Sequence, residues 1–141
     1  MKGKIKMATT KIWKVVKILD HVMDYATNSD KTENQYYTTG INCEVDSAYE
    51  EMMDTKMYFQ NEGGILGFHA YQSFKENISP EEAHRIGIQS AKEMWGDRFQ
   101  VVVTTHLNTD HIHNHFVINS VSFVSQAFLP LPYQMILQLF L

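Results

Sequence analysis

The sequence predicts a single α+β domain, in which an antiparallel sheet is backed by helices on one face. Its 141 residues, 44% of them hydrophobic, suit one core and are few for two domains. Two segments indicate the class. Residues 79–96 carry the signals of a capped helix, and residues 98–123 read as two strands joined by a short polar turn. Strands joined so closely pair in antiparallel fashion, which sets the type of sheet.

The N-terminal half is expected to hold two strands and two helices. Thr, Ile, Trp and Val suit a first strand over residues 9–16. Apolar residues then recur at helical spacing over residues 18–26, with Tyr25 near the end of that helix, and a polar run stops it. A second strand over residues 36–43 and a second helix over residues 46–60 follow.

The clearest single element is the helix that follows a strand over residues 65–74. Ser79 is a typical N-cap, Pro80 suits the first helical position, and Glu82 completes a capping box. Gly96 is expected to end the helix as a left-handed cap. The sequence therefore predicts both ends of this helix as well as its existence.

Two strands over residues 98–105 and 112–123 complete the predicted sheet. The run Val101-Val102-Val103 is apolar at consecutive positions, which is typical of a strand buried on both faces. We therefore expect this strand to lie inside the sheet.

The charges are distributed unevenly along the chain. The net charge is −4, yet residues 1–17 contain six lysines and no acid, and no formal charge follows Asp110. The single cysteine, Cys43, excludes an internal disulfide framework and fits a reducing compartment. Neither end reads as a secretory signal or a membrane span.

The expected domain covers residues 1–123. Residues 1–6 read as an extension, because Met7 begins a segment that resembles an ordinary protein start. Residues 124–141 form an apolar tail interrupted by prolines and glutamines. The lysines beside Trp13 are either a solvated arm or a contact for a nucleic-acid backbone.

Four of the seven histidines lie between residues 106 and 115. His113 and His115 are two apart on a predicted strand, so their side chains leave the same face. His106 ends the preceding strand across the turn, close enough for three imidazoles to meet on one ion with positions left open. His111 shares the alternation but lies at the turn, and is expected to be a neighbour only. The alternative is a polar hairpin face with solvated histidines.

A metal with open positions can polarise a phosphoryl oxygen, so the site would suit phosphoryl transfer by water or by a side chain. Tyrosine is a suitable nucleophile for nucleic acid, because its phenolate attacks phosphorus and leaves again readily. The sequence shows no HEXXH helix, no Cys-X-X-Cys pattern and no glycine-rich phosphate loop.

Four segments in order carry a family resemblance: DYATNSDKT at 24–32, GFHAYQSF at 67–74, PEEAHRIG at 80–87 and THLNTDHIHNHFVINSV at 105–121. Together they resemble the relaxase and mobilisation-nuclease family of plasmids and integrative elements, which are MobA/VirD2-like, His-hydrophobic-His endonucleases. The similarity runs from about Ala8 to Phe123, and the histidine stretch is its most specific part.

The resemblance implies a DNA relaxase with a metal site on a central antiparallel sheet. Such an enzyme nicks single-stranded DNA at an origin of transfer through a covalent 5′-phosphotyrosine link, for conjugative transfer or mobilisation. The implied roles are Tyr25 as nucleophile, His106, His113 and His115 as metal ligands, and Ser73 and Lys31 as DNA contacts. The implied ion is Mg²⁺ or Mn²⁺, with Zn²⁺ as a third option. The implied setting is the bacterial cytoplasm, with accessory mobilisation proteins and no membrane.

Alternatives stay open for several of these residues. Tyr36 or Tyr37 could be the nucleophile in place of Tyr25. Ser73 could merely pair with a neighbouring strand. His69 is expected to be structural or adjacent to DNA rather than a ligand.

Two departures from the family pattern affect the predicted activity. Asn108 stands where an Asp is common, and residues 124–141 are unlike the charged segments that usually follow. The chain is therefore expected to be a C-terminally incomplete relaxase, whose tail could be a frameshift product. The competing functions are a remnant that binds DNA or metal without catalysis, and a metal-dependent phosphoesterase that uses water.

Overall fold

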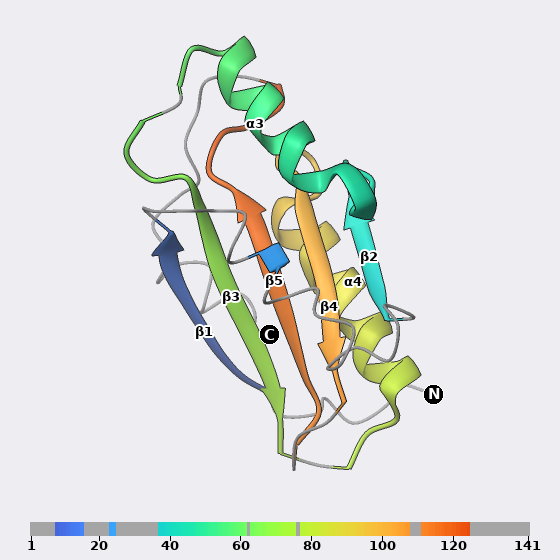
Figure 1. Cartoon of the computed structure of the whole chain (residues 1–141). Helices are drawn as coiled ribbons and strands as arrows, with labels where there is room; N and C mark the ends of the chain where they lie inside the picture. The colour runs from blue at the N-terminus through green and yellow to red at the C-terminus, as the bar shows by residue number, and fades with distance from the viewer. Residues whose placement is uncertain are drawn as a thin grey trace.

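Five strands form one antiparallel sheet in the order β1-β3-β5-β4-β2 (Figure 1). The computed structural model describes residues 8–15, 23–24, 37–61, 63–75, 77–107 and 111–124. Within these ranges two α-helices pack on the sheet, so the predicted α+β class with a central antiparallel sheet is confirmed. No helix in these ranges is long and apolar enough to cross a lipid bilayer.

The observed elements follow the predicted order. The strands are β1 Ala8–Val15, β2 Thr38–Ile41, β3 Gly67–Phe74, β4 Val101–His106 and β5 His113–Asn119. The helices are a short 3₁₀ turn η1 Val45–Ser47, α3 Ala48–Tyr58 and α4 Pro80–Trp95. The helix expected over residues 18–26 lies outside the described residues apart from residues 23 and 24, which are helical.

The two helices lie on opposite faces of the sheet, so the expectation that helices cover one face is wrong. In Figure 1, α3 crosses in front of the strands and α4 lies behind them. The three valines of β4 show why. Val101 and Val103 pack in the cluster that includes α4, Val102 packs with α3, and all three are fully buried. The apolar run at 101–103 is thus buried on both faces of the sheet, as its sequence predicts.

The start of α4 is as predicted and its end is not. The Ser79 hydroxyl accepts a hydrogen bond from the backbone N–H of Glu82 at 3.1 Å, and Pro80 occupies the first helical position. Gly96 has φ −62°, which is right-handed, so the expected left-handed cap does not form. The chain instead continues into a right-handed turn, in which the N–H groups of Arg98 and Phe99 both reach the Trp95 carbonyl.

A buried lysine joins α3 to the end of β5. The Lys56 side chain is fully buried, and its Nζ donates to the Asn119 side-chain oxygen and to the Ser120 hydroxyl. Burial lowers the pKa of the Lys56 ammonium from its usual 10.5 to about 8. The Asn119 side-chain amide also donates to the Met52 carbonyl, so β5 is hydrogen-bonded to α3 at a second point.

We expect the lowered Lys56 pKa to make stability rise with pH. Between pH 8 and 10.5 the native state has released this proton while the unfolded state still holds it, so unfolding becomes less favourable as pH increases. Relative to Lys56→Met, the unfolding free energy of the wild type should gain up to about 3 kcal/mol over that range. Urea titrations at several pH values measure it, with Lys92→Met, at an exposed lysine of α4, as the control. A wild-type minus K56M difference that stays flat would contradict the expectation.

Candidate metal centre

Three histidines meet where β4 and β5 pair. In the register of these strands His106 lies directly opposite His113, and Thr104 lies opposite His115. Because β-strand side chains alternate between faces, all three imidazoles leave the same face of the sheet. The ring centroid of His106 lies 5.2 Å from that of His113 and 4.0 Å from that of His115. The hairpin predicted from the sequence therefore brings these side chains together.

The donor set fits a metal ion. One ring nitrogen from each of His106, His113 and His115 can be chosen so that the three lie within 4.8 Å of one another. Three imidazole nitrogens form an open ligand set, which leaves room for water or substrate. His106 and His115 are buried and His113 is half-buried, so the group lies at the edge of the solvent. The triad could therefore bind an ion that also reaches a substrate.

His111 is not part of this group. It is exposed at the turn, and its backbone carbonyl accepts a hydrogen bond from Nδ1 of His113 at 3.1 Å. This contact orients the His113 ring and leaves Nε2 as the nitrogen that would face an ion. The expectation that His111 is a neighbour agrees with this arrangement.

A fourth histidine supports the triad from β3. His69 is 5% exposed, and its Nε2 lies 2.8 Å from Nδ1 of His115 in a hydrogen bond. Burial and the nearby His106 lower the pKa of His69 from 6.5 to about 4, so its ring is neutral at pH 7. A neutral His69 can accept the Nδ1 proton of His115, which would leave His115 Nε2 for an ion. Metal-bound histidines commonly have such a partner.

The other predicted site residues divide into two groups. Ser73 is half-buried on β3 and lies directly opposite His113 in the strand register, so it borders the triad. Tyr25 and Lys31 lie outside the described residues, as does Tyr36.

Tyr37, the other alternative nucleophile, lies within the described residues. It is 7% exposed, and its hydroxyl donates to a Glu81 carboxylate oxygen at 2.7 Å.

A buried polar network lies directly behind the triad, on the α4 face. The His84 ring bonds to the hydroxyls of Thr39 and Thr105 at 2.8 and 2.9 Å. Thr105 then donates to the Asn114 side-chain oxygen at 2.6 Å, and Asn114 donates to Gln72. No sequence motif marks this network, although strand alternation puts Thr105 and Asn114, each next to a triad histidine, on the opposite face. The network ties α4 to the hairpin that carries the histidines.

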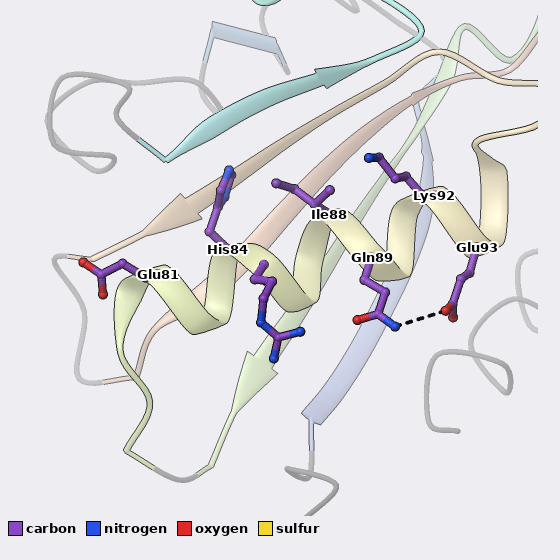
Figure 2. Close-up of a pocket in the computed structure, with 7 residues that line it drawn as sticks. Glu81, His84, Ile88, Gln89, Lys92 and Glu93 are labelled. Atoms are coloured by element: carbon purple, nitrogen blue, oxygen red, sulfur yellow. Dashed lines mark hydrogen bonds between the residues drawn. The ribbon is translucent and has the colours of Figure 1, made fainter. Parts of the chain in front are cut away.

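A groove lies on α4, away from the triad. It measures about 400 Å³ and runs along α4, where it is lined by residues such as His84, Ile88 and Lys92 (Figure 2). Gln89 and Glu93 on the same helix are hydrogen-bonded to each other at 3.2 Å. Because α4 covers the face opposite the three histidines, this groove and the candidate metal centre are separate.

Comparisons with known proteins point to one family. The model of the family "Relaxase: MobA/VirD2-like, nuclease domain" matches residues 25–134. Protein rlx of Staphylococcus aureus is 36% identical over 117 residues, which cover 82% of this chain and 34% of that protein. The group II intron-interrupted relaxase LtrB of Lactococcus lactis subsp. cremoris is 30% identical over 129 residues, covering 72% of this chain and 23% of that protein. The chain thus spans about a third or less of the length of these relatives.

Proposed function

Because the chain belongs to the MobA/VirD2-like relaxase nuclease family, we propose that it nicks single-stranded DNA at an origin of transfer, in conjugation or mobilisation. The observation that supports this most directly is the histidine triad, with three ring nitrogens within 4.8 Å of one another on the sheet face opposite α4. Ser73, directly across from His113, gives the same face a hydroxyl that can donate to a DNA phosphate. Accessory mobilisation proteins are the proposed partners in the cell.

We propose that His106, His113 and His115 hold a divalent cation, Mg²⁺ or Mn²⁺ in the first instance and Zn²⁺ as a third option. When bound there, the ion would polarise a phosphoryl oxygen and offset the charge that develops during transfer. The protein's own part is to present three imidazoles and to orient them. His69 orients His115, and the His111 carbonyl orients His113.

The proposed nucleophile is Tyr25. Its phenol oxygen attacks the phosphorus and forms a phosphotyrosine bond, while the bond from phosphorus to the 3′ oxygen breaks. The phenol proton is released, and the 3′ oxygen takes up a proton as it leaves as a hydroxyl. The 5′ end of the strand stays attached to the protein, so the reverse reaction can rejoin it.

One experiment separates this mechanism from the two competing functions. The full chain is incubated with single-stranded fragments of the DNA that carries its gene, in Mn²⁺, in Mg²⁺ or in EDTA, and is followed by denaturing gel and intact mass. A relaxase gives cleaved DNA and a protein whose mass includes a strand. Cleavage without added mass indicates a phosphoesterase that uses water, and metal binding that depends on His106 without cleavage indicates a non-catalytic remnant. Either of the last two results overturns the proposal.

Replacing His69 by leucine is expected to weaken Mn²⁺ binding by about 10- to 100-fold, the usual effect of losing a partner that orients a metal ligand. The physical reason is that the His115 ring would lose its hydrogen bond at Nδ1. Calorimetric Mn²⁺ titration measures the change. His69→Gln, which keeps a polar group able to hydrogen-bond, should restore part of the affinity. If H69L binds the ion as tightly as the wild type, His69 does not act through His115.

A further inference from the structure

The edge strand β1 presents two exposed side chains on the same face as the triad. Lys11 lies directly opposite Tyr71 in the β1–β3 register, and Trp13 lies opposite His69. Residues directly opposed in a sheet share a face, and His69 contacts His115, so Lys11 and Trp13 border the candidate metal centre. Trp13 is 43% exposed, so part of its ring is accessible to a ligand.

The Trp13 ring begins a row of rings that leads to the triad. Its centroid lies 4.6 Å from that of His69, and the His69 centroid lies 5.0 Å from that of His115. Tyr71 contacts both ends of the row, at 6.2 Å from Trp13 and 6.0 Å from His115. Trp13 is two strands from His115, or about 10 Å at the usual strand spacing. It is thus within reach of nucleotides that flank a phosphate held at the triad.

Around the row of rings, the charge carried by the strands suits a polyanion. Lys11 is exposed beside the row of rings. None of the strand residues described on this face of β1, β3, β5, β4 and β2 is acidic. An exposed aromatic ring next to a lysine is the combination that proteins use to bind single-stranded nucleic acid, since the ring stacks on a base and the cation pairs with a phosphate.

We propose that Trp13 stacks on a nucleobase of the bound single strand, close to the phosphate held at the triad, and that Lys11 pairs with a backbone phosphate of the same strand. This inference rests on the proposed function, because it assumes that single-stranded DNA is the substrate. In this proposal, β1 helps to hold the DNA strand beside the candidate metal centre. Because Trp13, Lys11 and the histidines lie on the same face of the sheet, one DNA strand can contact all of them at once.

The test uses the full chain and a fluorescein-labelled randomised single-stranded oligonucleotide, with polarisation measured in EDTA so that affinity is read without the ion. Trp13→Ala should weaken binding roughly 5- to 150-fold, the range that base stacking on one aromatic ring gives. Trp13→Phe should retain part of the affinity. Tyr58→Ala, at an aromatic residue of α3 that is 80% exposed, should leave binding unchanged.

A matched pair of lysines on the same strand tests the phosphate contact. Lys11 and Lys14 are both exposed, but Lys14 lies opposite Phe68, which packs in the α4 cluster, so it leaves the other face. Lys11→Ala should reduce the slope of log affinity against log salt by about 0.7, as expected for one contact to a single strand. Lys14→Ala should leave the slope near its wild-type value.

Tryptophan fluorescence gives a readout that does not depend on an affinity loss. The chain has two tryptophans, and Trp95 is only 2% exposed. Single-stranded DNA should therefore quench wild-type emission through Trp13, and Trp13→Phe should remove most of that quenching. If both Trp13 variants bind within twofold of the wild type while the wild type still forms its metal-dependent adduct, this inference is wrong and the proposed function stands. If the wild type neither binds nor cleaves the DNA, both are wrong.

Discussion

His113→Ala is expected to lower Mn²⁺ affinity by more than about 100-fold and to remove metal-dependent nicking. Changes in residues that merely orient a ligand cost about 10- to 100-fold, so loss of a ligand should cost more. His113 is the best choice among the three histidines because it is half-buried, whereas His106 and His115 are buried and their loss would also disturb packing. Calorimetry with Mn²⁺ and a gel assay of nicking measure the two effects.

His111→Ala is the matched control for this prediction. It removes an imidazole only two residues away, from an exposed position, and keeps the backbone carbonyl that bonds to His113. Its ion affinity and nicking rate should stay within about twofold of the wild type. Thermal unfolding of both variants should be similar. Equal ion binding by His113→Ala and His111→Ala would contradict the assignment of the triad as the ligand set.

Tyr25→Phe is expected to abolish the covalent protein–DNA adduct, with a fall in rate of more than about 10³-fold. The variant removes the phenol oxygen that forms the bond to phosphorus, and deletion of a covalent nucleophile commonly costs several orders of magnitude. Intact mass after incubation with DNA and Mn²⁺ gives a direct readout. An unchanged adduct in Y25F would show that another residue is the nucleophile.

Tyr36→Phe and Tyr37→Phe test the alternatives in the same assay. The Tyr37 hydroxyl already donates to Glu81, and its ring packs against His84 of α4, on the face opposite the triad. We therefore expect Tyr37→Phe to keep the adduct and to lose about 1 kcal/mol of stability with that hydrogen bond. Loss of the adduct in Tyr36→Phe alone would move the nucleophile to that position.

The parts of the fold and site that the sequence predicts are those set by local patterns. The triad follows from alternation on two strands joined by a short turn, so His106, His113 and His115 could be placed together without tertiary information. The N-cap of α4 follows from Ser79 and Pro80. These features depend on residues that are close in the sequence.

The parts that were missed depend on contacts between distant segments. Long-range packing decides which face of the sheet each helix covers. Local sequence patterns carry no such information, so they do not predict that α3 and α4 lie on opposite faces. The role of His69 depends on the pairing of β3 with β5, which sets its distance to His115. The burial of Lys56 depends on where α3 docks, since the local sequence gives no sign of a buried cation.

The strand order also has a consequence for how the protein folds. The β4–β5 hairpin is the pairing in the sheet with the shortest connection, and His106 and His113 are seven residues apart along the chain. His69 lies 46 residues from His115, and Trp13 lies 56 residues from His69, so these contacts close much longer loops. Short loops close at a lower entropic cost and sooner than long ones. The folding chain can therefore bring its three histidines together first. The strands β3 and β1, which carry His69 and Trp13, would then pair beside a ligand set that has already formed.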